Sequence, residues 1–343
     1  MTAIDATGTP PLEVSIVVPV FRGESTLGRV VGELEALTAP TTTPDGRVFR
    51  LVEAVLVWDH GPDASDRVIA ELVDRFPWVR PIWLSRGFGQ HPATVAGMAA
   101  TRGEWVVTMD EDGQHDPADI ARLLDRAYAE RSELVYAAPV NRPPHSWLRN
   151  LGSSLAKGLV LRALTGARAV PFHSFRLVHG PHARVVAAFC GPGVYLDVAL
   201  SWVIGSATTC PARMRAEGRP SATYSYRRLV SHFWRLVLSS GNRPLRLVSG
   251  IGLVTSALGV AYSVVLVAQR LSGETDVQGW TSAIVATLLV GGLILVALGI
   301  IAEYVGLAAG MSMGKPAYVP LSPPFWSRTA PGPGERAGGD GGG

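Results

Sequence analysis

Two aspartates separated by one residue, with a glutamine two positions further on, form the group in this sequence best suited to holding a metal ion. They are Asp110, Asp112 and Gln114. Carboxylate and amide oxygens are hard ligands that suit Mg²⁺ or Mn²⁺, and such ions commonly bind one or two carboxylates together with substrate phosphates. The alternative is an ordinary acidic turn ahead of a helix that starts at Asp116-Pro117. The rest of the chain decides between the two.

A short apolar run, residues 105–109, leads into this group and predicts a buried strand. Apolar, β-branched runs predict further strands at residues 14–20, 54–58, 79–84 and 134–138. Helical spacing predicts helices at residues 24–37, 66–75, 92–101 and 117–130. This alternation predicts an α/β fold with a mostly parallel sheet and helices on both faces. Each of the first four strands ends in a polar or glycine-containing turn, so we expect these turns to share the sheet edge where ligands bind.

The second half of the chain is less regular and leads to two long apolar stretches. A helix is expected over residues 147–164, a short strand over 172–177 and a helix over 193–204. Residues 224–239 mix aromatic, apolar and basic side chains, which favours a helix lying on a membrane surface or, equally, an amphipathic core helix. Residues 247–268 and 280–302 contain no charge, and each exceeds the ~20 residues that cross a hydrocarbon core. Two membrane spans are therefore predicted, in preference to two core helices.

The expected domain plan follows from these stretches. It comprises a flexible N-terminus (1–11), a soluble domain (12–223), an interfacial helix (224–243), a transmembrane hairpin (244–304) and a tail (305–343) that is disordered at its end. The arginines ahead of the first span are Arg227, Arg228, Arg235, Arg243 and Arg246. By the positive-inside rule they place the soluble domain in the cytoplasm. The N-terminus has no apolar run, so no cleaved signal peptide is expected. Glycines in the spans leave homo-oligomerisation open.

The composition agrees with a membrane portion. The 343 residues are 47% hydrophobic and 17% charged, with a mean hydropathy of +0.22. The net charge of +3 rests mostly on arginine, whose planar fork suits phosphate recognition, and no nucleic-acid partner is expected. Cys190 and Cys210 provide neither a metal spacing nor a disulfide framework, which indicates a reducing compartment. The histidines near the motifs, His91, His115 and His173, fit no zinc site.

An ordered series of short motifs resembles one known family over most of the chain. In chain order the motifs are Ser15-Ile16-Val17-Val18-Pro19-Val20, Asp59-His60-Gly61-Pro62-Asp63, Leu84-Ser85-Arg86-Gly87-Phe88-Gly89, Asp110-Glu111-Asp112-Gly113-Gln114, Phe175-Arg176-Leu177, Arg243-Pro244-Leu245-Arg246, and Glu303-Tyr304 followed by Lys315-Pro316-Ala317-Tyr318-Val319. Each alone is weak, but the ordered set is specific. It resembles the inverting family 2 glycosyltransferases, and among them the polyprenyl-phosphate glycosyltransferases, such as the bactoprenol glucosyltransferases and the dolichyl-phosphate mannose synthases.

The resemblance implies a GT-A-like domain that moves a sugar from a nucleotide diphosphate sugar to a polyprenyl phosphate, with inversion and with Mg²⁺ or Mn²⁺ as cofactor. It implies an enzyme of the bacterial inner membrane with a cytoplasmic catalytic domain. Asp110 and Asp112 would be catalytic and, with Gln114, would hold the metal. The residues implied in nucleotide-sugar binding are Pro19, Val20, Asp59, Arg86, Asp110 and Glu111. The candidates for binding the acceptor phosphate are Arg142, Arg149, Arg176, Arg213 and Arg215.

Arg176 is the acceptor candidate to which the sequence gives a definite position. Strand alternation places Phe175 and Leu177 on one face, and Ser174 and Arg176 on the other. We expect Arg176 to reach into the cleft and bind the lipid phosphate rather than the nucleotide. Asp197, on the helix that follows, is expected to be structural rather than catalytic.

Some positions depart from the family pattern. His60 replaces the second aspartate of the nucleotide turn, Gly87 an asparagine, Ser174 an aspartate ahead of Phe-Arg-Leu, and Pro139 one of two basic residues. These departures bear on base and sugar recognition and leave the metal motif intact. Three alternatives stay open: a transferase acting on another lipid or a glycan, a catalytically impaired scaffold on the same fold, and a transport component. The sequence gives neither the sugar nor the choice between UDP and GDP.

Overall fold

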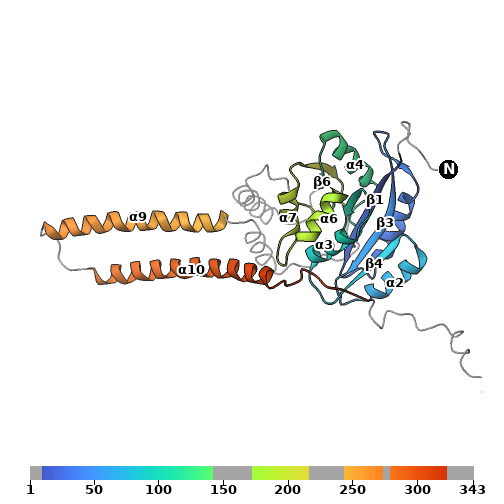
Figure 1. Ribbon diagram of the computed structural model, residues 1–343. Helices are drawn as coiled ribbons and strands as arrows, with labels where there is room; N and C mark the ends of the chain where they lie inside the picture. Colours follow the sequence, from blue (N-terminus) through green and yellow to red (C-terminus); the bar gives the residue numbers. More distant parts are fainter. Residues whose placement is uncertain (1–9, 142–171, 216–242, 273–278, 323–343) are drawn as a thin grey trace, which may run out of the picture. The chain divides into compact units, whose positions relative to one another are not determined.

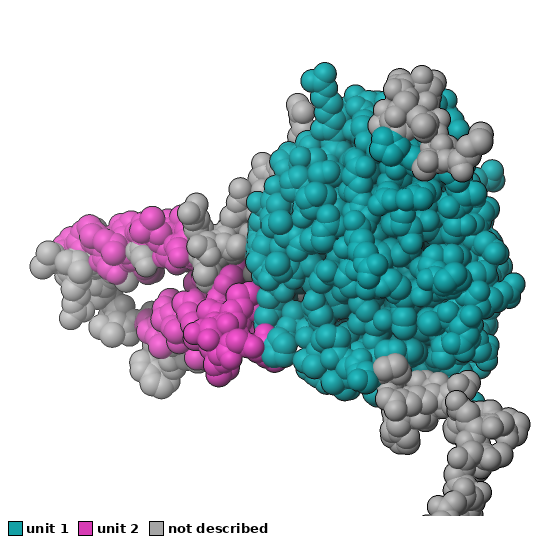
Figure 2. All heavy atoms as spheres, turned by 45° about the vertical axis from the view of Figure 1, so that its right-hand side comes forward, with its two compact units in different colours: residues 1–146, 170–224, 316–343 teal, residues 147–169, 225–315 magenta. Residues whose placement is uncertain are grey.

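The computed structural model describes residues 10–141, 172–215, 243–272 and 279–322 (Figure 1). The chain divides into two compact units, coloured in Figure 2. Unit 1 comprises residues 1–146, 170–224 and 316–343, and unit 2 comprises residues 147–169 and 225–315. The end of the chain therefore returns to unit 1 after the apolar stretches of unit 2.

Unit 1 is built on a nine-stranded mixed sheet with the path β8-β6-β7-β5-β1-β3-β4-β9 and β2 beside β3. Strands that run in one direction are β1 (Leu12–Val20), β3 (Val48–Trp58), β4 (Val79–Leu84), β5 (Trp105–Thr108), β6 (Leu134–Pro139) and β8 (Ala207–Ala212). Strands that run against their neighbours are β2 (Thr41–Thr42), β7 (Arg176–His179) and β9 (Pro320–Leu321). The expectation of a mostly parallel sheet in an α/β fold is confirmed.

Helices cover both faces of the sheet, and each face has its own apolar cluster. One face carries α1 (Leu27–Leu34), which continues into the short helix η1 (Glu35–Leu37), α2 (Ser65–Arg75) and α4 (Asp119–Glu130). The other face carries α3 (Gln90–Ala100), α6 (Gly180–Phe189) and α7 (Leu196–Val203). Alternation along β1 serves both faces, because Ile16 and Val18 join the first cluster and Val17 joins the second. A parallel sheet covered on both faces accounts for the nearly continuous apolar run of β1.

The sequence did not predict strands β2 and β8, and it also did not predict the positions of β7 and β9. The strand expected over residues 172–177 begins at Arg176, and it lies antiparallel between β5 and β6. The tail after the second apolar stretch adds β9 to the edge of β4, and the amide of Ser85 donates a hydrogen bond to the carbonyl of Val319 at 2.9 Å. Tyr318 packs against the apolar cluster of the α3 face. The tail thus begins as an ordered part of the soluble unit.

Unit 2 contains two long helices, α9 (Arg243–Leu271) and α10 (Trp280–Ser312), which form an antiparallel hairpin in Figure 1. Within them, Val248–Val265 and Leu289–Ser312 are long and apolar enough to cross a membrane, and neither window is buried. Leu253 and Leu295, for example, are 73% and 71% exposed. Apolar surface of this extent marks a membrane or partner contact rather than a face left in water. The length and composition of the two helices indicate association with a membrane.

Several predicted regions lie outside the described residues. They are the N-terminus up to residue 9, the helix predicted over 147–164, most of the interfacial segment 224–243, and the tail from residue 323. The glycines considered for packing the spans are Gly252, Gly259, Gly291 and Gly292. A side-chain carbon at any of the four would meet no atom within 4 Å, so they do not form a close contact within this hairpin.

Candidate active site

The turns after β1, β3, β4 and β5 lie on one edge of the sheet, because these four strands run parallel. The first two turns are joined directly. The amide of Gly23 donates to Ser65 Oγ at 2.7 Å, and the amide of Asp59 donates to the carbonyl of Val20 at 2.8 Å. A side chain at Gly61 would collide with the carbonyl oxygen of Phe21, so the close approach of the two turns requires glycine there. This edge is a connected framework of turns.

Asp59 fixes the turn after β4. Its carboxylate accepts hydrogen bonds from the backbone amides of Phe88 at 2.7 Å and Gly89 at 2.8 Å, and its side chain is buried. Burial raises the pKa of Asp59 and the two amides lower it, with a net rise above the ordinary value. The next residue, His60, adopts left-handed backbone geometry and packs its ring against Trp58. The observed contacts of Asp59 are therefore structural, and its contact with a ribose stays a prediction.

Asp110 lies at the end of β5 and is held by two neutral side chains. The amide of Gln90 donates to Asp110 Oδ1 at 2.6 Å, and the hydroxyl of Ser174 donates to Oδ2, also at 2.6 Å. The amide of Asp110 donates to Nδ1 of His115 at 3.0 Å, and the imidazole stacks on Phe175. Burial lowers the pKa of His115, which outweighs the nearby aspartates, so the ring is neutral at pH 7 and carries its proton on Nε2. Among the residues that the structure describes, no arginine pairs with the Asp110 carboxylate.

The rest of the motif forms a compact turn. Asp112 Oδ1 accepts the amide of Gln114 at 2.9 Å, and Gly113 has a left-handed φ of 76°. The carboxylate of Glu111 instead accepts the amides of Phe21 and Arg22, at 3.2 and 2.9 Å. Glu111 thus connects the β5 turn to the β1 turn, and a contact between Glu111 and a nucleotide stays a prediction.

The donor set at the β5 turn fits a divalent cation. Asp110 and Asp112 supply carboxylate oxygens at a strand end, and Gln114 adds an amide. In the ranges that the structure describes, no group of three or more His, Cys, Asp or Glu side chains is arranged to enclose a metal. Two carboxylates that complete their coordination with substrate phosphates are the arrangement that Mg²⁺ commonly uses. The residues therefore suit an ion that binds together with its substrate.

Arg176 does not reach into an open cleft, so that expectation is wrong. Its side chain is 4% exposed, its guanidinium pairs with Asp197 of α7, and its Nε donates to Thr108 Oγ1 at 3.2 Å. Alternation does place Arg176 opposite Phe175 and Leu177, but helix α7 covers that face. Burial lowers the pKa of Arg176, and the adjacent Asp197 carboxylate more than offsets this, so the pKa lies above its ordinary value. The structural role expected for Asp197 matches these contacts.

The other predicted arginines differ in their surroundings. Arg86 is exposed and lies over the ring of Phe88, with 4.4 Å from its central carbon to the ring centroid. Arg213 is exposed and directly follows β8. Arg215 instead bonds to Glu33 at 2.5 Å and Asp116 at 2.8 Å. These two ion pairs hold Arg215 against the β5 turn.

The remaining residues predicted for the site are two arginines and two residues of β1. Arg142 and Arg149 lie outside the described residues. Pro19 and Val20 are buried in β1, so their side chains shape the strand end from within. The amide of Arg215 donates to the carbonyl of Gln114 at 2.9 Å, which ties the segment after β8 to the motif.

Sequence reasoning missed Gln90 and Ser174 as partners of Asp110. Ser174 carried a usable signal, because it stands where the resembling family commonly has an aspartate. A hydroxyl at that position donates to Asp110, whereas a second carboxylate would repel it. Gln90 carried no such signal, because it precedes the predicted helix and belongs to no catalytic pattern.

The mostly parallel sheet with its motif-bearing edge defines a GT-A-type glycosyltransferase domain. Residues 15–180 match the family model Glycosyl transferase family 2, and residues 243–307 match the model GtrB C-terminal hairpin. Residues 15–180 therefore carry a family 2 glycosyltransferase domain, and residues 243–307 a hairpin of the GtrB type.

Curated relatives align over nearly the whole chain. The undecaprenyl-phosphate 4-deoxy-4-formamido-L-arabinose transferase of Klebsiella pneumoniae is 26% identical, over 90% of this chain and 93% of that protein. The prophage bactoprenol glucosyl transferase homolog of Escherichia coli is 25% identical, over 90% of this chain and 98% of that protein. A solved structure of glucosyl-3-phosphoglycerate synthase from Mycobacterium tuberculosis, in complex with phosphoglyceric acid, is 16% identical with a TM-score of 0.46. That match covers 68% of this chain and 80% of the other.

Proposed function

We propose that this protein transfers a sugar, with inversion, from a nucleotide diphosphate sugar to a polyprenyl phosphate. The observation that carries the proposal is the β5 turn, where Asp110 and Asp112 stand at the ligand-binding edge of the sheet in a chain that also has two membrane-length helices. The names of the curated relatives, which include undecaprenyl-phosphate and bactoprenol sugar transferases, support the choice of acceptor. The product would be a polyprenyl-phospho-sugar.

The donor is expected at the four joined turns. Charge develops on the leaving nucleotide diphosphate as the bond to the sugar breaks. A divalent cation, when bound, supplies positive charge that stabilises this leaving group. Asp110, Asp112 and Gln114 would hold that ion, while Gln90 and Ser174 fix the orientation of the Asp110 carboxylate. Orientation of a metal ligand by such neighbours sustains both affinity and rate.

The proposed acceptor, a phosphate, does not need a strong general base from the protein. A phosphate monoester has a second pKa of ~6 and is largely ionised at neutral pH, so its oxygen attacks without a strong general base. This fits a serine at position 174. The acceptor needs cations to hold it in line with the sugar, and exposed Arg213 is the described candidate, with Arg142 and Arg149 outside the described residues. Because Arg176 and Arg215 are already paired with carboxylates, we do not assign them to the acceptor.

The membrane arrangement extends the proposal. Both helices of the hairpin would cross the bacterial inner membrane, with the soluble unit in the cytoplasm and the connecting loop on the opposite side. Placing the catalytic unit beside the bilayer brings it to a lipid phosphate in the cytoplasmic leaflet. Labelling of a cysteine at Thr275 by a membrane-impermeant reagent in intact cells, without labelling at Ser327, is the expected result. The reverse pattern would invert the topology.

The direct test is transfer of radiolabelled sugar from a panel of UDP and GDP sugars to undecaprenyl phosphate in detergent. We expect label in the lipid with Mg²⁺ or Mn²⁺ and none after chelation by EDTA. Undecaprenol without phosphate is the matched control and should stay unlabelled. Label in a glycan or in another lipid alone would overturn the acceptor assignment. Saturable donor binding with no transfer to any acceptor would indicate an impaired scaffold.

A further inference from the structure

A pocket lies at the opposite edge of the sheet from the motif turns. Its volume is about 460 Å³, within the range of roughly 300–1,000 Å³ typical of small-molecule sites. Its lining residues come from the beginning of β1, the first half of β3, and the segments that precede β4 and β5. Because these strands are parallel, this end of the sheet is a full strand length from the β5 turn. The pocket is therefore separate from the candidate active site.

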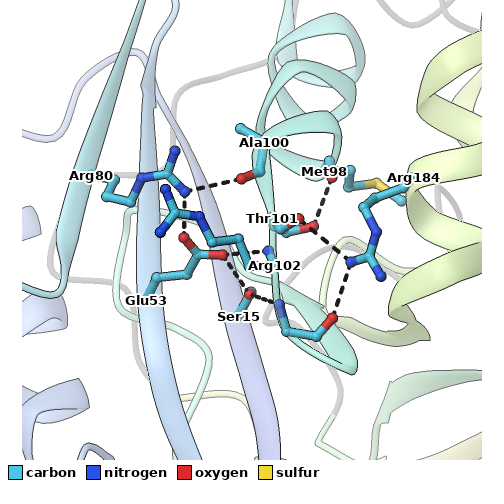
Figure 3. Close-up of polar contacts among 9 residues, drawn as sticks. Ser15, Glu53, Arg80, Met98, Ala100, Thr101, Arg102 and Arg184 are labelled. Atoms are coloured by element: carbon cyan, nitrogen blue, oxygen red, sulfur yellow. Dashed lines mark hydrogen bonds and ion pairs between the residues drawn. The ribbon is translucent and has the colours of Figure 1, made fainter.

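Glu53 organises the floor of this pocket, as Figure 3 shows. Its side chain is 5% exposed, and Oε1 accepts hydrogen bonds from Ser15 Oγ at 2.8 Å and from the amide of Arg102 at 2.6 Å. Oε2 accepts a bond from Arg80 at 2.5 Å, and the same Arg80 nitrogen donates to the carbonyl of Ala100 at 3.0 Å. The carboxylate is therefore committed to groups within the protein, and the Arg80 guanidinium is held in a fixed position.

The positive charges that line the pocket exceed the negative ones. Arg50, Arg80 and Arg102 face only two carboxylates, Glu13 and Glu53. Arg50 pairs with Glu13 at 2.5 Å and Arg80 with Glu53, whereas the guanidinium of Arg102 bonds to no carboxylate among the described residues. Figure 3 draws the Arg102 guanidinium beside that of Arg80. Arg80 and Arg102 line the same pocket, and Glu53 pairs with the guanidinium of Arg80 while it accepts only the backbone amide of Arg102, so an added anion would stabilise the remaining positive charge.

We propose that this pocket binds a phosphate-bearing small molecule, with the phosphate between Arg80 and Arg102. Arginine donors in a planar fork match the oxygens of a phosphate group and bind it in a bidentate manner. Trp78, Pro77 and Leu51 also line the pocket, and the half-buried indole offers an apolar wall for the organic part of the ligand. The site requires no contact with the nucleotide sugar or the lipid, so it stands whether or not the proposed transfer reaction is correct.

The test is calorimetric titration of the full-length protein in detergent with inorganic phosphate and with phenyl phosphate. Arg102→Gln removes the guanidinium that has no carboxylate partner and should weaken phosphate binding about tenfold, the usual effect of losing one charge-assisted contact. Arg67→Gln, at an exposed position of helix α2, is the matched control and should stay within about twofold. Glu13→Gln frees Arg50 from its ion pair and should strengthen binding. Phenyl phosphate should bind more tightly than inorganic phosphate because its ring reaches Trp78.

The outcomes separate clearly. Weakening by Arg102→Gln with strengthening by Glu13→Gln supports the site, because a general charge effect at the active site would not depend on these residues. Binding that is equally affected by Arg102→Gln and Arg67→Gln would overturn it, as would the absence of saturable phosphate binding to the wild-type protein. All three variants alter exposed or half-exposed side chains, and thermal melting checks that each remains folded.

Discussion

Two charged centres lie side by side in the sheet and show opposite arrangements. Thr108 of β5 is the register partner of Arg176 on β7, so Arg176 of the Arg176–Asp197 pair lies opposite a residue two positions before Asp110. In the pair, both side chains are almost fully buried and their charges cancel. Among the described residues, the Asp110 carboxylate is 27% exposed, accepts hydrogen bonds from the neutral donors Gln90 and Ser174, and lies 3.7 Å from Nε2 of the neutral His115 ring. Charge that is cancelled inside the protein supports the scaffold, whereas charge that is oriented but left uncancelled at the surface can bind a ligand.

This comparison predicts that the largest effect on sugar transfer comes from substitution in the metal-binding turn that contains Asp110 and Asp112. Asp112→Ala should reduce sugar transfer at least a thousandfold, about 4 kcal/mol of transition-state stabilisation, because the ion that offsets leaving-group charge loses a carboxylate. Steady-state transfer under saturating Mg²⁺ or Mn²⁺ measures the loss. Asp45→Ala, at an exposed surface carboxylate, is the control and should be near wild type. A variant at position 112 that keeps a tenth of wild-type turnover would remove Asp112 from the metal site.

Disruption of the buried Arg176–Asp197 pair should lower the stability of the protein. Asp197→Ala leaves the buried Arg176 charge unpaired and should lower the free energy of unfolding by roughly 3 kcal/mol or more. Thermal melting of the purified protein in detergent measures the change. The double variant Arg176→Met/Asp197→Leu removes both charges and should be more stable than the single one. A melting temperature unchanged by Asp197→Ala would show that the pair does not carry this role.

A smaller effect on sugar transfer is expected at Ser174, which donates a hydrogen bond to Asp110. Ser174→Ala removes the hydroxyl that orients Asp110 and should lower transfer about tenfold, the lower end of what loss of a ligand-orienting hydrogen bond costs. The apparent affinity for Mn²⁺, followed by titration of metal in the presence of nucleotide, should fall with it. Ser201→Ala, at an exposed serine of α7, serves as the control. Lost transfer with unchanged Mn²⁺ affinity would contradict a role through Asp110.

The smallest effect is expected at Arg213. Its exposed side chain is screened by solvent, so Arg213→Gln should raise the Michaelis constant for polyprenyl phosphate only about threefold to fivefold. Donor affinity, measured by calorimetry without lipid, should not change. Weaker binding of the nucleotide sugar, with an unchanged Michaelis constant for polyprenyl phosphate, would instead place Arg213 at the nucleotide.

The regular part of the fold and the metal-binding turn could be predicted from local patterns. The apolar run at residues 79–84 matches β4 without adjustment, and the position of Asp110 follows from its place after a buried strand. The partners of these residues could not be predicted in the same way. Ser174 and Gln90 contact Asp110 from 64 and 20 positions away; Ser174 is brought there by the insertion of β7 beside β5, and Gln90 by its place at the start of α3.

Arg176 illustrates the same limit. Its face of the strand was predicted correctly from alternation, but periodicity does not say what covers a face. The covering helix α7 supplies Asp197, a contact that requires the tertiary arrangement of two segments 21 positions apart. The two-residue strand β9 gave no periodic signal either, because two residues are too few to establish alternation.

The return of the chain to β4 has a consequence for biosynthesis. Strand β9 is translated after both apolar helices, so the outer edge of β4 has no partner while the ribosome synthesises residues 85–319. Domains generally fold as they emerge, which leaves an incomplete sheet with exposed amide and carbonyl groups during membrane insertion. A nascent chain released after the second helix would keep that open edge and could pair with other chains. The edge of β4 is therefore paired only in chains in which both helices of the hairpin have already been synthesised.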